Sequence, residues 1–228
     1  MPTAPATALV VLLQAGILAV LAVAVRRGNV AATVNALGSF ALAVLPTTLA
    51  WLGRPVALGP ELPLWLAAAG LFHSVGMLGP YDSVWWWDHL THTLSAALVA
   101  ALVYAAALVA LPTLGLSADP VTAAAVTVAL TFGAGVLWEL VEILARAVGE
   151  RYGVEPVLVH YGWRDTAADL VFDVVGAVLV VALDVRVFLG AAGRFPGASR
   201  LLILGGGAVL AGSVVAGLLV WVGPSLRG

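Results

Sequence analysis

The chain of 228 residues has no cysteine and no lysine, and only 10% of its residues are charged. The absence of cysteine excludes disulfides, thiolate metal sites and cysteine nucleophiles. All ten basic residues are arginines, and a net charge of -2 without a basic run argues against nucleic acid as a partner. The H-E-x-x-H, G-x-S-x-G and Walker motifs are also missing. The sequence therefore lacks these common catalytic signatures.

Apolar residues dominate what is present. They make up 62% of the chain, whereas soluble domains carry about 25% charged residues and correspondingly less apolar surface. A globule of this length cannot hide so much apolar surface from water, so lipid must be the solvent. The sequence predicts an all-α protein, a polytopic transmembrane helical bundle. It forms a single integral membrane domain over 1–228, with its motif-bearing core at about 62–185.

Seven stretches approach the roughly 20 apolar residues that a membrane helix needs. The stretch at 62–78 is the shortest of them. The predicted spans lie at about 6–25, 30–52, 62–78, 88–111, 120–148, 165–185 and 201–222.

The distribution of arginines indicates an orientation. Consecutive spans alternate in direction, so we call the side that follows the first span face A and the opposite side face B. The arginines on face A are Arg26, Arg27, Arg146, Arg151, Arg164 and Arg227. Those on face B are Arg54, Arg186, Arg194 and Arg200. The positive-inside rule then places face A in the cytoplasm of a cell-membrane protein, with the N-terminus outside and the C-terminus cytoplasmic.

Three polar segments interrupt the apolar pattern, and alternation of the spans puts all three toward face A. They read YDSVWWWDHLTHTL (81–94), WELVEILAR (138–146) and WRDTAADLVFD (163–173). Within each segment the acidic and imidazole side chains recur at helical spacing and so share one face. An ionised side chain at the centre of a lipid-facing helix costs about 2.5–3.5 kcal/mol, so these faces should point at one another.

Some of these residues have simpler explanations, which stay open at this stage. Asp88 and Asp165 lie where they could act as helix N-caps. Arg146 could form an i,i+4 ion pair with Glu142 or hold a phosphate. His73 is a lone histidine in an apolar helix, for which a hydrogen-bonded packing role is favoured.

His92, Glu139 and Asp173 resist such explanations, because they lie too deep in their spans to cap a helix and have no local partner. Ionisable residues at such depth are functional by default. Imidazole with carboxylates suits zinc, manganese or non-haem iron, and carboxylates alone suit magnesium. The predicted metal ligands are His89, His92, Glu139, Glu142, Asp165, Asp169 and Asp173. The predicted catalytic residues are Asp88, His92, Glu139, Glu142 and Asp169.

Three functions are compatible with this cluster. The first is a metal-dependent hydrolase or transferase acting on a membrane lipid or polyprenyl phosphate. The second is a proton- or cation-coupled transporter that uses the same residues as a relay. The third is a structural membrane protein whose polar residues only bind its helices together. Membrane lipid is the expected partner, and assembly into a homo-oligomer stays open.

The three segments in this order resemble the YjdF-type family of integral membrane proteins. That family has an aromatic-Asp-x-x-x-His segment, a Glu-x-x-Glu segment and an Asp-Thr-x-x-Asp segment that runs into Gly-Ala. Here these read Trp87-Asp88 to His92, Glu139 to Glu142, and Asp165-Thr166 to Asp169 with Gly176-Ala177. His89 is outside the pattern, and Asp173 can be apolar in it. The order of motifs is also similar, less closely, to the VanZ-like membrane proteins. The resemblance implies that the polar cluster is one unit, and it implies no reaction.

Overall fold

A computed structural model describes residues 4–53, 59–153, 156–158 and 161–222, which are almost entirely helical and contain no strand. The helices of this part are α1 (Ala4–Arg26), α2 (Val30–Trp51), α3 (Glu61–Gly76), α4 (Pro80–Ser83), α5 (Trp87–Thr113), α6 (Pro120–Tyr152), α7 (Trp163–Ala182), α8 (Leu189–Arg194) and α9 (Pro196–Val222). The predicted all-α class is confirmed, and a helix occupies each of the seven stretches predicted as spans.

Local sequence signals set several helix ends. Asn29 caps α2 by accepting a 2.8 Å hydrogen bond from the backbone N–H of Ala32. The side chain of Asp119 caps α6 by accepting hydrogen bonds from the backbone N–H groups of Val121 and Thr122. Pro120 follows at the first helical position. Gly153 ends α6 with φ = 64°, a left-handed conformation that favours glycine. These contacts satisfy backbone groups that a helix end leaves unpaired.

The bundle is organised around α5, which packs against α3, α6, α7, α8 and α9. Its buried face is rich in alanine, and these small side chains let neighbouring helices approach closely. One close approach of two backbones is at Gly176 of α7, where an added Cβ would lie 2.5 Å from the carbonyl oxygen of Thr93. A glycine is therefore required where α7 crosses α5.

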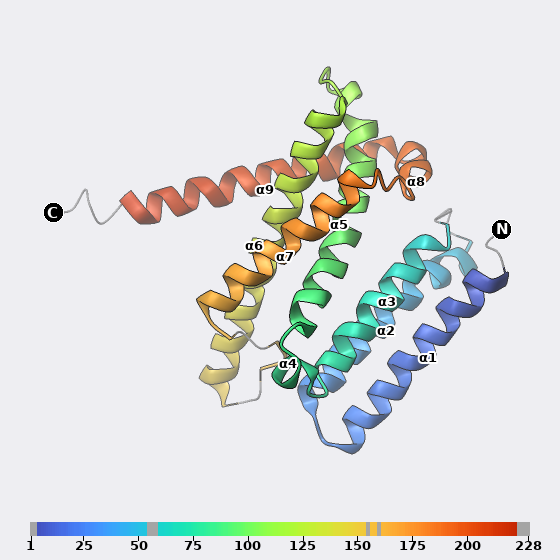
Figure 1. The fold of residues 1–228 in the computed structure, drawn as a ribbon, viewed down its shortest axis with the longest axis vertical. Helices are drawn as coiled ribbons and strands as arrows, with labels where there is room; N and C mark the ends of the chain where they lie inside the picture. The colour runs from blue at the N-terminus through green and yellow to red at the C-terminus, as the bar shows by residue number, and fades with distance from the viewer. Residues whose placement is uncertain (1–3, 54–58, 154–155, 159–160, 223–228) are drawn as a thin grey trace.

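The helices form two groups, visible in Figure 1 as α1–α3 on one side and α5–α9 on the other. Among the described residues, α3 is the helix of the first group that packs against α5. Two tryptophans reinforce this junction: Trp65 donates to the carbonyl of Leu94 at 3.1 Å, and Trp87 donates to that of Phe72 at 3.2 Å. Elsewhere a pocket separates the two groups.

The end of α3, the start of α5, the end of α6 and the start of α7 lie toward the same end of the bundle, at the bottom of Figure 1. The turn between α1 and α2 lies there too. This is the arrangement predicted for face A from the alternation of spans. It brings the three polar segments together.

Four of the described helices are long and apolar enough to cross a membrane: Pro5–Arg26, Val30–Trp51, Trp87–Thr113 and Pro120–Tyr152. With 16 residues α3 is short for a span, and α7 carries three aspartates. Figure 1 shows α9 crossing the α5–α7 group at a large angle and extending to one side. The multi-pass membrane class is supported, while the number of crossings stays a prediction.

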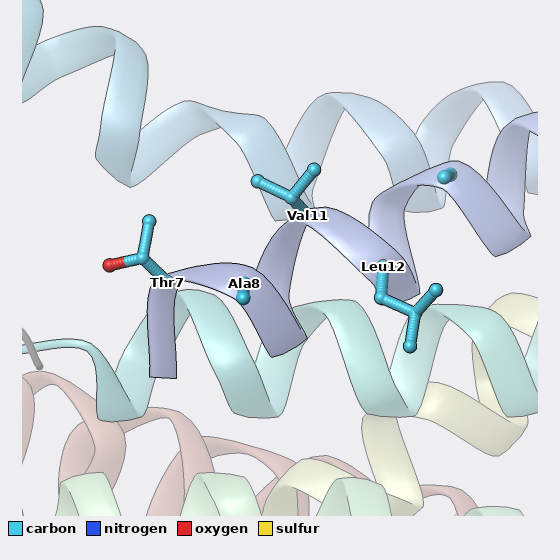
Figure 2. Close-up of a pocket in the computed structure, with 5 residues that line it drawn as sticks. Thr7, Ala8, Val11 and Leu12 are labelled. Atoms are coloured by element: carbon cyan, nitrogen blue, oxygen red, sulfur yellow. The ribbon is translucent and has the colours of Figure 1, made fainter. Parts of the chain in front are cut away.

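The outer surface of α1 illustrates the surface that such helices offer to lipid. Thr7, Ala8, Val11 and Leu12 line a hollow there and project from one stretch of α1, as Figure 2 shows. Val11 is 58% exposed and Leu12 is 67% exposed. The hollow has no titratable side chain, so it carries no chemistry.

Candidate metal centre

The centre of the polar cluster is the imidazole of His92, which projects from α5. Its Nδ1 lies 3.1 Å from Oδ1 of Asp173 on α7, a hydrogen-bonding distance. An ionised carboxylate can only accept, so Nδ1 is the donor in this contact, and Nε2 is the nitrogen that the neutral imidazole would offer to a metal. Histidines that bind metal are commonly oriented by a carboxylate in this way.

The Nε2 of His92 faces two further carboxylates. It lies 3.8 Å from Oδ1 of Asp88, one turn earlier on α5, and 4.0 Å from Oδ1 of Asp169 on α7. One ligand atom from each of these three residues falls within 4.8 Å of the other two. Two ligands at about 2.1 Å from a tetrahedral metal lie about 3.4 Å apart, so small side-chain rotations would complete the geometry. Asp88, His92 and Asp169 thus form a group that fits a divalent ion.

Several buried atoms of the cluster have no hydrogen-bond partner. Asp169 is 1% exposed and its Oδ1 is unpaired, while Glu139 on α6 is 3% exposed with both carboxylate oxygens unpaired. Glu139 is in electrostatic range of Glu142 and Asp169, which are acids themselves. Buried polar atoms normally find partners, and unpaired buried charges are costly. The cluster therefore needs positive charge from protons or a bound cation.

His89 lies at the edge of the cluster. Its ring stacks on Phe172, with centroids 4.3 Å apart, and its Nδ1 lies 3.9 Å from Oδ1 of Asp169. Since this Nδ1 is buried without a hydrogen-bond partner, His89 is placed to add a ligand or to orient Asp169. His89 and His92 of the 81–94 segment thus both lie beside aspartates of the 163–173 segment, and this geometry agrees with the expectation that the polar faces point at one another.

The other predicted residues lie farther from the three-residue group. Asp165 is in the first turn of α7, in electrostatic range of Asp88 and Asp169 but outside the group. Glu142 accepts a 2.9 Å hydrogen bond from the indole N–H of Trp138. Arg146 pairs with Glu150 at 2.9 Å.

The capping interpretation of two aspartates is wrong. The N-cap positions of α5 and α7 are Trp86 and Gly162, and neither makes a side-chain cap. Both helices begin a residue or more earlier than the sequence pattern indicated. Asp88 is therefore free to face His92, which places this predicted catalytic residue beside the predicted metal ligands His92 and Asp169.

A glycine makes room for the orienting carboxylate. A Cβ added at Gly135 of α6 would lie 2.1 Å from Oδ2 of Asp173, closer than real Cβ atoms come to other atoms. The missing side chain at 135 thus lets the carboxylate of Asp173 lie between α6 and His92. The sequence places Gly135 on the same helical face as Glu139, and the structure gives a reason for the glycine there.

The cluster opens into a pocket of about 750 Å³ between the two groups of helices. Its polar end includes Asp88, His92, Asp173 and Glu142, whereas Leu42, Leu66, Leu98 and Val99 line its apolar end. No arginine is among the described residues that line it. A pocket with one acidic end and one hydrocarbon end matches the shape of an amphiphile.

A second polar chain approaches the cluster from the α1–α3 group. His73 lies with Nε2 2.9 Å from Oδ1 of Asn35 and with Nδ1 2.6 Å from the hydroxyl of Tyr81. That hydroxyl lies 3.3 Å from Oγ1 of Thr91, which in turn donates to the backbone carbonyl of Asp88 at 2.8 Å. Burial raises the pKa of Tyr81, so its phenol keeps its proton.

Neither Tyr81 nor Asn35 is singled out by the sequence alone as a candidate functional residue. The one available signal was that a polar residue within an apolar span needs a partner. The structure supplies that partner as His73, which agrees with the hydrogen-bonded role favoured for this histidine.

Comparison with known proteins identifies a family. A family model described as "Predicted membrane protein (DUF2238)" covers residues 8–189. This span includes all three polar segments, and it confirms the resemblance to the YjdF-type family. No curated protein and no solved structure matches the chain.

Proposed function

The chain belongs to the DUF2238 family of predicted membrane proteins, and we propose that it is a metal-dependent enzyme that acts on an amphiphilic lipid. The observation that carries the proposal is the convergence of Asp88, His92 and Asp169, with Asp173 orienting the imidazole. Three protein ligands with space for a further one are typical of catalytic rather than structural metal sites.

The donor set favours particular ions. One imidazole nitrogen with carboxylate oxygens suits zinc, manganese or iron, and an all-oxygen set would suit magnesium better. A metal in such a site supplies an activated water or stabilises charge on a phosphoryl oxygen. Glu142 lines the pocket next to this group and is available to hold or transfer a proton.

Two features weigh against the alternative functions. A purely structural network should satisfy its own polar atoms, whereas Glu139, Asp169 and His89 keep unpaired buried atoms. A transporter needs access from both faces. Among the described residues, the acidic and imidazole groups lining the pocket lie at its face A end, and the α5 positions beyond Val99 are packed against other helices.

The test is metal analysis of purified protein. We expect close to one divalent ion per chain by inductively coupled plasma mass spectrometry, lost in His92→Ala and Asp169→Asn. Asp184→Asn serves as the control, because Asp184 pairs with Arg186 near the opposite end of α7. A folded wild-type protein that binds neither zinc, manganese nor magnesium would refute the proposal.

A further inference from the structure

The pocket has a side opening between α2 and α6. The two helices do not pack against each other anywhere in 30–51 and 120–152, yet residues of both line the pocket. Three of these lining residues are substantially exposed: Val34 at 46%, Leu42 at 56% and Trp138 at 42%. In a membrane, an opening between spanning helices faces hydrocarbon and not water.

The water side of the pocket is covered by the segment before α7. Val157, Leu158 and Tyr161 line the pocket there. The side-chain amide of Asn35 donates to the carbonyl of Val157, and the Tyr161 hydroxyl donates to Asp82 at 2.7 Å. A molecule that enters beside α2 therefore reaches the cluster without passing these contacts.

The charge of the pocket limits how a head group is held. The described lining contains Asp88, Glu142 and Asp173 but no arginine, and the chain has no lysine. An anionic head group meets these three carboxylates and no arginine, so a cation between them would favour its binding. A phosphate is a strong ligand for a divalent ion. A metal held by Asp88, His92 and Asp169 would therefore attract an anionic head group to the acidic end of the pocket.

From these observations we infer that the occupant is a membrane lipid with a phosphate head group, which enters between α2 and α6. One hydrocarbon chain lies along Leu42, Leu66 and Val99, and the phosphate binds through the metal. This inference rests on the proposed function, because it requires the same metal. It adds the substrate class and the route, and it makes lipid binding depend on metal binding.

The experiment blocks the opening and leaves the metal group intact. Gly38 of α2 lines the pocket, and a Cβ there meets nothing within 4 Å, so Gly38→Phe adds bulk without a backbone clash. The matched control is Gly212→Phe on α9, where a Cβ also meets nothing within 4 Å and the residue is outside the pocket. The probes are a single-chain lysophosphatidic acid, a monoacylglycerol of equal chain length and inorganic phosphate.

Binding is measured by native mass spectrometry with and without a saturating divalent ion. We expect lysophosphatidic acid to bind only with metal and to bind about tenfold more weakly or worse in Gly38→Phe, since excluding two buried methylene groups has that effect. Metal content should stay unchanged in both glycine variants. Lysophosphatidic acid binding that is equal in the two variants would overturn the inference, even with the metal present. The inference would also be overturned if lysophosphatidic acid bound without metal, if monoacylglycerol bound as tightly as lysophosphatidic acid, or if inorganic phosphate did so. A folded wild-type protein that binds no divalent ion would instead refute the proposed function.

Discussion

Replacing Gly135 with alanine should weaken metal binding without touching any metal ligand. The new Cβ would lie 2.1 Å from Oδ2 of Asp173 and 3.1 Å from its Cγ. Contacts of real Cβ atoms essentially never fall under 3.0 Å, so the carboxylate must withdraw by about 0.9 Å. Because Oδ1 of the same carboxylate holds Nδ1 of His92 at 3.1 Å, the imidazole loses the group that orients it.

The expected effect on affinity follows from what such orienting groups contribute. Losing a carboxylate that orients a metal-binding histidine typically costs 10–100-fold in metal affinity, or about 1.4–2.7 kcal/mol. Gly133→Ala is the control on the same helix, because its Cβ would meet only the far end of the flexible Leu210 side chain, at 3.0 Å. Both substitutions raise intrinsic helix propensity equally, by about 0.5–1 kcal/mol.

Competition against a chromogenic zinc chelator, on detergent-purified protein, measures the affinity. Gly135→Ala should bind zinc 10–100-fold more weakly than wild type, while Gly133→Ala should match wild type within about twofold. Adding Asp173→Asn to Gly135→Ala should weaken binding little further, since both changes remove the same interaction. Equal zinc affinity in the two alanine variants would show that Asp173 does not orient a metal-binding His92.

Further predictions follow from other parts of the structure. Asp173→Asn should lower zinc affinity in the same chelator assay but less than His92→Ala does, because the amide keeps the shape but not the charge of the carboxylate. Gly176→Ala should destabilise the protein by about 1–3 kcal/mol in thermal unfolding, because the new Cβ would lie 2.5 Å from the Thr93 backbone carbonyl. A melting temperature equal to that of the wild type would contradict the close packing of α5 against α7. Hydrogen bonds from Thr122 and other capping groups lower the pKa of Asp119 to about 2, so its stabilising effect is present above about pH 4 and is lost as the pH falls toward 2. Asp119→Ala should therefore lower the melting temperature at pH 6 but much less near pH 2, and a constant difference would rule out this capping role.

The sequence was sufficient to predict the membrane class, the helix positions and the shared location of the polar segments. Apolar stretches that alternate in direction must return to the same face, and this places His92, Glu139 and Asp173 at similar depth. The specific pairings depend on helix rotation and on sub-ångström packing, which helical periodicity does not encode. Gly135 and Gly176 show this: each is an ordinary small residue in the sequence, and its role is apparent only from what a Cβ would meet.

The polar chain through Tyr81 was also beyond sequence reasoning. It joins α2, α3, α4 and α5, and its members are far apart in the sequence, so no local spacing marks them. Asp88 was a candidate catalytic residue from its segment, but its position relative to Asp169 depends on where α5 begins. An N-cap residue has non-helical dihedrals and turns its side chain toward the first free N–H groups, whereas Asp88 lies inside α5 and shares a helical face with His92.

The junction between the α1–α3 and α5–α9 groups has a mechanical consequence. At the end that carries the aspartates, the two halves are joined by hydrogen bonds: Asn35 contacts Val157 and His73, and His73 contacts Tyr81. Hydrogen bonds depend closely on geometry, so a substitution at Asn35 or His73 would disturb this end of the junction and leave the apolar contacts of α3 in place.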